Sequence, residues 1–196
     1  GRLADVGTDH AYLPTALLLE GKISFAIAAD LRQGPLLRAK ETARKYGCQD
    51  RMAFRLCDGL KGIHPEEVDA IVIAGMGGET IAQILAASPW VQERSIPLVL
   101  QPMSSLPELR RWLQANGYQI QEERLAQEED TFYVVMSVQA GEMPPLTPAE
   151  QWAGRQSRDP LRGDYLETLL HKMDRAIRGL SLARTERGAA RQQELE

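Results

Sequence analysis

The chain has 196 residues, 43% of them apolar, with a formal net charge of −4 and two cysteines. This is enough for one full domain with a small appendage, and no stretch approaches the length of a membrane span. No secretory signal is visible, but the sequence begins inside a predicted strand, so we expect a fragment that lacks its natural start. Cys48 and Cys57 are too few for a disulfide framework and lie at no metal-ligand spacing from a histidine. We therefore expect a cytoplasmic protein with reduced thiols and no bound metal, whose net charge gives no overall attraction to nucleic acid.

The first strand-like run, residues 3–6, ends at Gly7 and is followed by a predicted helix over 11–20. A second buried strand, residues 25–30, ends in Asp30. Glycine after the first strand lets the backbone approach a ligand, and an acid after the second can accept hydrogen bonds from both hydroxyls of a ribose. We expect a ribose-containing ligand at this edge of the sheet.

The first turn distinguishes two such ligands. A pyrophosphate is bound by Gly-x-Gly-x-x-Gly before a helix, whereas this turn has one glycine followed by Asp9 and His10, and a carboxylate repels a pyrophosphate. A ligand with an ammonium, a sulfonium and a ribose suits Asp5 and Asp9 better. The residues favour S-adenosylmethionine over a nicotinamide cofactor, the alternative being that the aspartates only cap the helix.

Further strands and helices alternate along the chain. They are predicted as a helix over 34–46, a strand over 51–57, a strand over 69–74, a helix over 79–87, a strand over 96–102 and a helix over 106–115. The third strand ends at Asp58-Gly59, on the same edge as Asp30. The strand 69–74 is almost entirely apolar, which is typical of a central parallel strand. In the following residues 75–78, either the backbone approaches a ligand or takes positive φ, or strand and helix pack tightly.

From residue 118 the pattern changes. Residues 118–126 and 131–138 are strand-like and joined by a polar turn, which predicts a hairpin. Five β/α units followed by a hairpin predict an α/β fold, a mostly parallel Rossmann-like sheet with an antiparallel edge. This is the arrangement of class I S-adenosylmethionine-dependent methyltransferases.

The last quarter of the chain is predicted to be helical. We expect a domain over 1–140, a proline-rich linker over 141–148 and a helical coiled-coil domain over 149–196. A short helix from 149 to about 158 is expected to turn back at Asp159-Pro160 and pair with a longer one, while residues 185–196 are expected to fray. The longer helix has apolar residues at heptad spacing: Leu166, Leu170, Met173, Ile177 and Leu180.

The helical segment is locally basic, with nine Lys or Arg against five acids between Arg155 and Arg191. Such an excess forms either a solvated face with ion pairs or a phosphate-binding face. The heptad pattern is equally compatible with dimerisation, so the residues leave monomer and dimer open.

Several segments together resemble one family. ADVGTDHAYLP (4–14), the strand ending in Asp30 followed by QGP, RLCDGL (55–60), IAGMGG (73–78) and LQPMSSLPELRRWL (100–113) come in the order and spacing of the bacterial tRNA (adenine-N1)-methyltransferase TrmK family. The resemblance covers residues 2 to about 140. It implies a Rossmann-like methyltransferase domain with a C-terminal coiled coil, S-adenosylmethionine as methyl donor, and N1 of the adenine at position 22 of tRNA as acceptor. The family's N-terminal helix is absent from this sequence.

The resemblance also assigns site residues. It matches the first cofactor motif to Asp5, Gly7, Asp9 and His10, the ribose-binding acid to Asp30, the adenine-contacting pair to Asp58 and Gly59, and the loop facing the methyl group to Gly75, Met76, Gly77 and Gly78. Many family members carry Glu at the position of Asp30, so the carboxylate here is shorter by a methylene.

Methylation of adenine N1 needs no strong base, because the nitrogen lone pair lies in the ring plane; the protein has to position and desolvate the reactants. Asp9 is a candidate to stabilise the cationic product, and His10 contacts either the substrate or its own backbone. Met76 and Gln101 lie where the base should enter; the Gln101 amide matches an adenine edge or bonds to backbone. Tyr12 is either a stacking surface or part of the core.

The tail supplies candidate RNA contacts. If the basic face binds tRNA phosphates, the contacting residues are Arg155, Arg158, Arg162, Lys172, Arg175 and Arg178. Without the resemblance, the alternatives are a class I methyltransferase acting on a small molecule or protein, which needs no basic arm, and a binding domain without turnover. The intact acids Asp5, Asp30 and Asp58 argue against the latter.

Overall fold

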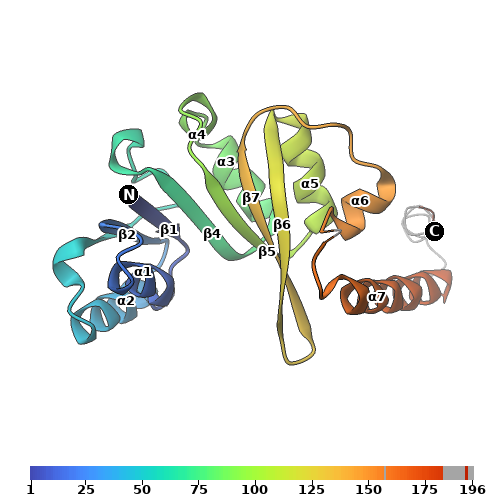
Figure 1. Cartoon of the computed structure of the whole chain (residues 1–196), viewed down its shortest axis with the longest axis horizontal. Helices are drawn as coiled ribbons and strands as arrows, with labels where there is room; N and C mark the ends of the chain where they lie inside the picture. Colours follow the sequence, from blue (N-terminus) through green and yellow to red (C-terminus); the bar gives the residue numbers. More distant parts are fainter. Residues whose placement is uncertain (157, 183–192, 194–196) are drawn as a thin grey trace.

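The structure is a computed structural model that describes residues 1–156, 158–182 and 193. The strands are β1 (Arg2–Val6), β2 (Phe25–Asp30), β3 (Met52–Leu56), β4 (Ala70–Gly77), β5 (Leu98–Ser104), β6 (Tyr118–Glu128) and β7 (Thr131–Ala140). In the described residues they form one seven-stranded sheet in the order β3-β2-β1-β4-β5-β7-β6 (Figure 1). Strands β1 to β5 are parallel, and β7 and β6 are antiparallel additions. The predicted fold class is confirmed.

The α-helices are α1 (Tyr12–Leu19), α2 (Gln33–Lys45), α3 (Gly78–Ala86), α4 (Trp90–Glu93), α5 (Leu106–Ala115), α6 (Pro148–Ala153) and α7 (Arg162–Leu182), with short 3₁₀ turns at Gln49–Arg51 and Pro65–Glu67. Helices follow β1, β2, β4 and β5 as predicted. The prediction of five β/α units is wrong at the third, because the described segment between β3 and β4 contains a 3₁₀ turn and no α-helix. The single turn α4 was not predicted, because four residues are too few for a helical period to show.

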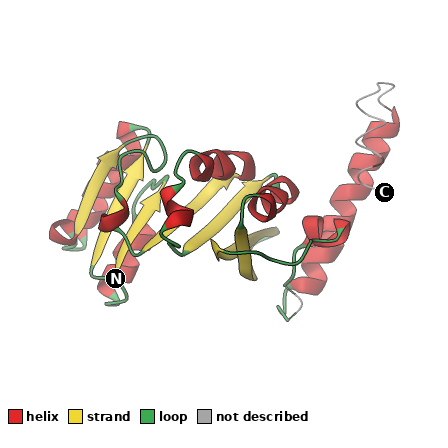
Figure 2. Cartoon of the chain, turned by 90° about the horizontal axis from the view of Figure 1, so that it is seen from above, coloured by secondary structure: helices red, strands yellow, loops and turns green. Residues whose placement is uncertain are grey.

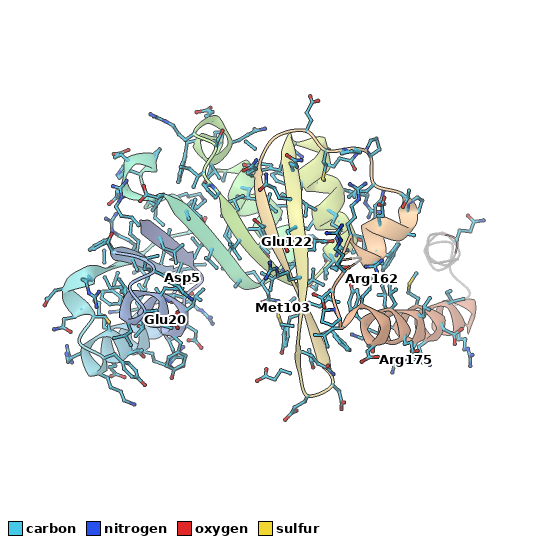
Figure 3. The ribbon with its side chains drawn as sticks, viewed as in Figure 1. Asp5, Glu20, Met103, Glu122, Arg162 and Arg175 are labelled. Atoms are coloured by element: carbon cyan, nitrogen blue, oxygen red, sulfur yellow. The ribbon has the colours of Figure 1, made fainter. Side chains whose placement is uncertain are left out.

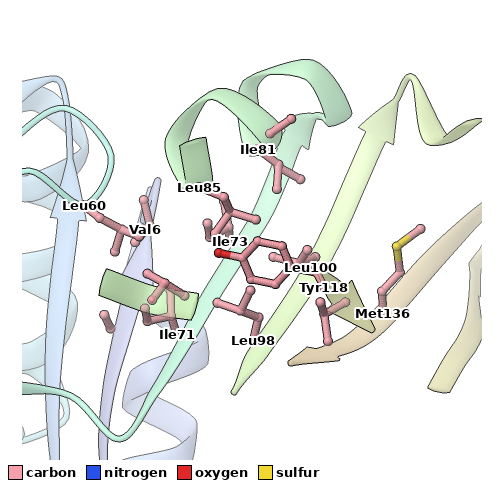
Figure 4. Packing of buried hydrophobic residues seen from close by; sticks show 14 of the residues in the cluster. Val6, Leu60, Ile71, Ile73, Ile81, Leu85, Leu98, Leu100, Tyr118 and Met136 are labelled. Atoms are coloured by element: carbon pink, nitrogen blue, oxygen red, sulfur yellow. The ribbon is translucent and has the colours of Figure 1, made fainter. Parts of the chain in front are cut away.

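The sheet is buried on both faces where its central strands lie. Along β1 and β2, Ala4 and Ile27 face the larger cluster of apolar side chains, whereas Ala26 and Ala28 face a smaller cluster under α1 and α2. Figure 4 shows the larger cluster, in which Ile71, Ile73, Leu98 and Leu100 of β4 and β5 pack together with Tyr118. Such double-sided burial explains the nearly continuous apolar runs of β2 and β4.

The parallel strands all end at one side of the sheet. We call this the carboxyl edge and define it as the strand ends and following turns at residues 7–12, 30–34, 57–62, 74–78 and 101–105. β1 pairs with β2 on one side and with β4 on the other, so the chain order reverses between β1 and β4. Open α/β sheets bind ligands at such a switch point, outside the carboxyl ends of the strands.

β4 is longer than predicted. It continues through Gly77, and its pairing with β5 shifts register between Ala74 and Met76 and again between Met76 and Gly77. Bulges of this kind re-aim side chains next to functional sites. The glycine segment is therefore an irregular strand end at the carboxyl edge rather than a free loop.

The C-terminal helices depart from the prediction at two points. α6 ends at Ala153, well before the predicted end near residue 158, because Gly154 takes φ +74°. Its main packing partner is α5, whereas the sequence predicted pairing with the longer helix that follows. The division of the chain at residues 141–148 stays a prediction.

α7 contains the predicted heptad residues, but its buried stripe is different. Tyr165 is buried and lies edge-on to Phe132, with ring centroids 6.0 Å apart, and Leu166 and Leu169 pack against the main core. Leu170 is 65% exposed. The remainder of α7 extends beyond the sheet, at the end of the molecule opposite the N-terminus (Figure 2). The side chain of Leu180, and residues 185–196 except 193, lie outside the described part of the chain.

A buried ion pair attaches this C-terminal segment to the sheet. The side chains of Arg110 on α5 and Glu123 on β6 are 0% and 2% exposed, with Arg110 Nε 2.8 Å from Glu123 Oε1. Arg110 Nη1 also donates to the carbonyl oxygens of Gln151 (2.7 Å) and Trp152 (2.9 Å), and Glu123 Oε2 accepts from the amide of Arg155 (2.6 Å). We call these contacts the C-terminal clasp. The arginine occupies free carbonyls at the end of α6, and the glutamate balances its charge.

Gly154 is part of this clasp. A Cβ atom at this position would lie 2.1 Å from Glu123 Oε2 and 2.3 Å from Gln156 Nε2, and the backbone has positive φ. Only glycine allows the chain to pass so close to the buried carboxylate. Asp159 then fixes the next stretch, since its Oδ2 accepts from the amide of Leu125 on β6 at 2.8 Å.

None of the helices in the described ranges is both long enough and apolar enough to cross a membrane. The same part of the chain also contains no group of three or more His, Cys, Asp or Glu side chains arranged to hold a metal ion.

Candidate active site

A cavity of about 450 Å³ opens at the carboxyl edge, between the ends of β1, β2 and β3 and the face of α3. Among the predicted site residues, the ones that line it are Gly7, Asp30, Asp58, Gly59 and Met76. These residues come from four separate strand ends, so the fold brings together positions that span seventy residues of sequence. The volume falls in the range of about 300–1,000 Å³ that is usual for small-molecule sites.

Gly7 forms the inner wall of this cavity. It has φ +81°, and its amide donates to the carbonyl of Ala29 at 2.8 Å, which turns the chain away from β1. A Cβ atom on Gly7 would lie 2.1 Å from Cε of Met76. The turn therefore needs glycine for its backbone angle, and the absence of a Cβ leaves room for the end of the Met76 side chain.

Asp30 presents a carboxylate to the cavity from the end of β2. Its side chain is 11% exposed, and Oδ1 accepts from the backbone amide of Arg32 at 2.7 Å. Within the described residues, Oδ2 has no hydrogen-bond partner. A fixed carboxylate with one open oxygen is suited to accept hydrogen bonds from ligand hydroxyls.

Asp58 and Gly59 form the outer wall, at the end of β3. Asp58 is exposed and pairs with Lys61, which also lines the cavity. Gly59 has φ +58°, and a Cβ there would lie 2.9 Å from Cγ1 of Ile84. The absence of a side chain lets this turn close against α3. Beside it, burial raises the pKa of the Cys57 thiol, so that cysteine stays protonated.

The wall supplied by α3 was not predicted. Thr80, Gln83 and Ile84 of α3, together with Ser88 just after it, line the cavity. A sequence signal existed, because a helix that begins directly after a glycine-rich strand end has its first turns at the carboxyl edge.

Asp5 lies below the cavity and does not line it. It is 7% exposed, within β1, and faces the α1 side of the sheet. Burial raises the pKa of this carboxyl, and the neighbouring Thr8 hydroxyl acts in the opposite direction. Asp5 is therefore placed to act through the first turn rather than through direct contact at the cavity wall.

Asp9 and His10 lie outside the cavity lining as well, on the solvent side of the first turn. Asp9 is engaged by the guanidinium of Arg38 on α2, whose Nε lies 3.1 Å from Asp9 Oδ1, and this hydrogen bond holds the pKa of Asp9 below its ordinary value. Nε2 of His10 is 3.6 Å from Asp9 Oδ2. The carboxylate is thus ionised but already balanced by an arginine.

Gln101 bonds to backbone, as one of the two sequence interpretations expected. Its Oε1 accepts from the amide of Gly75 at 3.0 Å, and its Nε2 donates to the carbonyl of Pro102 at 3.2 Å. Gly75 has φ +75°, so Gln101 fixes a turn that only glycine adopts without strain. Gly75 and Gly77 do not line the cavity themselves; they shape the strand end that carries Met76.

Gly78 shows the tight packing that the sequence left as an alternative for this segment. A Cβ atom on Gly78 would lie 2.5 Å from the carbonyl oxygen of Ser105 and 3.0 Å from Cβ of Leu109. The start of α3 can approach α5 only without that atom. Of the glycines at residues 75–78, Gly75 thus serves the turn and Gly78 serves packing.

The six basic residues predicted for RNA contact fall into two groups. Arg155 bonds to Glu150 at 2.8 Å, Arg162 donates to Gln156 at 2.6 Å and Arg178 pairs with Asp174 at 2.8 Å. Figure 3 shows Arg162 beside α6 and Arg175 farther along α7. Arg158, Lys172 and Arg175 are exposed and form no ion pair with another described residue. These three are the ones whose charge is available to a partner.

The sheet order, the single-glycine first turn and the acids after β2 and β3 define the chain as a class I methyltransferase. Residues 1–136 match the protein family described as "Methyltransferase domain". The tRNA (adenine(22)-N(1))-methyltransferase of Bacillus subtilis (strain 168) is 40% identical over 140 residues, which are 71% of this chain and 59% of the relative.

Solved structures agree with this assignment over almost the whole chain. The B. subtilis M1A22 tRNA methyltransferase TrmK is 31% identical with a TM-score of 0.83, covering 99% of this chain and 87% of that chain. The Streptococcus pneumoniae protein Sp1610, solved in complex with S-adenosyl-L-methionine, is 33% identical with a TM-score of 0.78, covering 98% and 89%. The chain belongs to the bacterial tRNA (adenine(22)-N(1))-methyltransferase family, the TrmK family, which confirms the resemblance seen in its motifs. It spans 59–61% of the length of the curated relatives it matches.

Proposed function

We propose that this chain transfers a methyl group from S-adenosylmethionine to N1 of the adenine at position 22 of bacterial tRNA. The observation that carries the proposal is the cavity at the carboxyl edge, with Asp30 and Asp58 in its walls, in a chain of the TrmK family. With tRNA as its substrate, the protein acts in the cytoplasm, as its composition predicts.

The residues in the cavity fit S-adenosylmethionine. The open oxygen of Asp30 suits the ribose hydroxyls, and Asp58 at the outer wall suits the amino group of the adenine moiety. Gly7 and Gly59 allow backbone to border the cavity at two turns where a Cβ would collide with Met76 or Ile84. Asp30 and Asp58 are matched in the lining by Arg32 and Lys61, so the cavity has no net charge and does not repel a ligand with a positively charged sulfonium.

When bound, S-adenosylmethionine supplies a methyl group on a positively charged sulfur, which an adenine N1 lone pair can attack without prior deprotonation. The protein's own contribution is then orientation and exclusion of water. Met76 stands at the end of β4, in contact with the first turn through Gly7, and borders the cavity on the side of β5. Gln101 acts as a positioning residue, because it holds the Gly75 turn that sets the direction of Met76.

Asp9 is proposed to stabilise the cationic 1-methyladenine product. Its low pKa keeps it ionised at neutral pH, and Arg38 fixes its position. Two variants separate charge from position: Asp9→Ala removes the carboxylate, and Arg38→Met leaves it in place but without its counter-charge. If Asp9→Ala retains the parent's turnover and cofactor affinity, this role is excluded.

We further propose that tRNA phosphates are bound by Arg158, Lys172 and Arg175, the exposed cations of the C-terminal segment. Arg155, Arg162 and Arg178 contribute less, since their guanidinium groups already have partners in the chain. Phosphate contacts weaken steeply with salt, so replacement of the three exposed residues by Gln should flatten the salt dependence of tRNA binding. The same replacement in the three paired residues is the matched control.

The proposed function is tested by incubating the protein with labelled S-adenosylmethionine and unmodified bacterial tRNA, followed by nucleoside analysis. We expect 1-methyladenosine, and none when position 22 of the tRNA is changed to guanine. Methylation at another position of the tRNA would support a tRNA methyltransferase but contradict adenine 22 as its target. Cofactor binding by calorimetry without any transfer to tRNA would favour a small-molecule or protein substrate instead.

A further inference from the structure

The turn after β1 carries a pair of stacked aromatic rings at the protein surface. The rings of His10 and Tyr12 are 5.0 Å apart between centroids and inclined by only 2°. Tyr12 is 64% exposed, so it is not part of the core. The intervening Ala11 is buried in the left-handed conformation, with φ 52° and ψ 32°, which places the residues on either side of it on the same side of the chain. The backbone thus adopts an angle that is unfavourable for a non-glycine residue in the turn that carries the two rings.

These rings are notable because the rest of the carboxyl edge has none. The segments 30–34, 57–62, 74–78 and 101–105 contain no Phe, Tyr, Trp or His. An enzyme that modifies a base atom inside an RNA helix has to take that base out of its stack, and it holds the base by stacking it on aromatic or apolar side chains. His10 and Tyr12 are therefore the aromatic surface that this edge offers to an extruded base.

We propose that Tyr12, supported by His10, is the surface on which the target adenine stacks during methyl transfer. The inference rests on the proposed function, because it names the residue that receives the substrate base. His10 covers one side of the tyrosine ring, and the exposure of Tyr12 leaves room for a third ring in the same direction. The turn that carries the pair begins at Gly7, which lines the cavity, so the stacking surface is connected to the cofactor site through five residues of chain.

The surroundings of the pair suit a base that gains positive charge. The electron-rich face of a tyrosine attracts a cation, and N1-methylation converts a neutral adenine into one. The Asp9 carboxylate lies 3.6 Å from His10 Nε2 and is held by Arg38 on α2. A negative group is thus fixed beside the ring pair.

The chain contains a matched control residue. Tyr46, directly after α2, is 45% exposed and lies beneath the ammonium of Lys45, 5.4 Å from its ring centroid. It precedes β3 and hence lies at the opposite edge of the sheet, where the parallel strands begin. Loss of an exposed tyrosine ring as such should affect Tyr12 and Tyr46 variants alike, whereas loss of a stacking surface should affect only Tyr12.

The test compares steady-state methylation of unmodified tRNA by the parent, Tyr12→Leu, Tyr12→Phe, His10→Ala and Tyr46→Leu. Removing one base-stacking ring should lower kcat/KM for tRNA by about 5- to 150-fold in Tyr12→Leu, with unchanged affinity for S-adenosylmethionine and unchanged melting temperature. Tyr12→Phe should retain activity within about threefold, because it keeps the ring. His10→Ala should fall between these two variants, since it removes only the support.

Several outcomes overturn the inference. One is a Tyr12→Leu variant with the parent's kcat/KM, and another is a loss no larger than that of Tyr46→Leu. A loss in Tyr12→Leu that is matched by Tyr12→Phe would also contradict stacking. If the parent itself produces no 1-methyladenosine, the proposed function fails and the stacking role fails with it; if the parent is active and the Tyr12 variants are unaffected, only the stacking role fails.

Discussion

Carboxylates are central to two regions of this molecule, but they are used in opposite ways. At the carboxyl edge, Asp30 is held by one backbone amide and keeps one oxygen open to the cavity, and Asp58 is exposed to solvent. In the C-terminal clasp, Glu123 is buried and both of its oxygens are bonded, one to Arg110 and one to the amide of Arg155. The first arrangement leaves an oxygen free to accept hydrogen bonds from a ligand, whereas in the second both carboxylate oxygens attach one segment of chain to another.

The comparison extends to glycine. Gly7 and Gly59 at the carboxyl edge keep side chains out of the walls of a cavity, whereas Gly154 lets a backbone turn pass against the buried Glu123 carboxylate. Both regions therefore use glycine for a close approach, but at the carboxyl edge the closely packed turns border an open cavity, whereas in the clasp they surround a buried carboxylate. It follows that substitutions at the carboxyl edge should change ligand affinity more than stability, and that substitutions in the clasp should do the reverse.

The largest effect is expected from breaking the clasp. Glu123→Ala leaves the guanidinium of Arg110, which is fully buried, without its counter-charge, and this should lower the free energy of unfolding by about 3–5 kcal/mol. Urea denaturation measures the change. The double variant Arg110→Met/Glu123→Leu should lose less than the single one, because it removes both charges. A Glu123→Ala protein within about 1 kcal/mol of the parent would contradict the importance of the pair.

The next largest effect is expected at the carboxyl edge, on binding. Asp30→Ala should lower the affinity for S-adenosylmethionine by about 10- to 100-fold, because hydrogen bonds to a charged group are worth about 1.5–3 kcal/mol. The melting temperature of the variant should stay unchanged. Calorimetric titration measures the affinity, and thermal unfolding measures the melting temperature. Asp130→Ala, in the exposed turn between β6 and β7, is the control. Equal affinity in the Asp30 variant and the parent would remove Asp30 from the cofactor site.

The order of elements could be predicted from the sequence, because apolar periodicity and turn residues lie within a few positions of one another. The residues at which the strands end could not be predicted. β4 continues through Gly77 because β5 pairs with it across two register shifts, and the partner strand is invisible to a local pattern. The same limit applies to the cavity: Gly7 and Asp30 were found from their strand ends, whereas Gln83 and Ile84 take part only because α3 folds back over the edge.

The clasp escaped prediction for a similar reason. Arg110 lies four positions after Leu106 and three before Leu113, which places it on the apolar stripe of α5 and indicates burial. Because a charged residue is normally expected at the surface, this indication is easily missed. Glu123 gave no signal, since alternation from Tyr118 and Ile120 would point it to solvent. A register shift between Ile120 and Glu122 reverses the alternation and turns Glu123 inward.

A smaller effect is expected at Asp5, where a substitution should raise the stability rather than lower it. Burial raises the pKa of its carboxyl, so the folded state is favoured most below the ordinary aspartate pKa of 3.8, and this contribution is lost as the pH rises through the raised value. Asp5→Asn should therefore be more stable than the parent at pH 7, and the difference should shrink toward pH 4. Thermal unfolding across this range measures it. An Asn variant that is less stable at pH 7 would mean that the buried carboxylate is stabilised in a way the structure does not contain.

The smallest expected effect is in the outer layer of the clasp, where Glu150 caps the start of α6 and bonds to Arg155. These contacts hold the pKa of Glu150 at about 2, below the ordinary value of 4.5, with Arg155 as the main cause and the amide of Thr147 next. Its contribution to stability is therefore present above pH 4.5 and lost as the pH falls toward 2. In urea denaturation, the parent should have a higher free energy of unfolding than Glu150→Gln at pH 6, and this difference should vanish near pH 2. Because the pair is partly exposed, salt should reduce the same difference at pH 6, whereas the buried Arg110–Glu123 pair should respond little. If the difference in free energy of unfolding did not change with pH, Glu150 would stabilise α6 by hydrogen bonding that does not need its charge. The clasp would then depend on charge only at the buried Arg110–Glu123 pair.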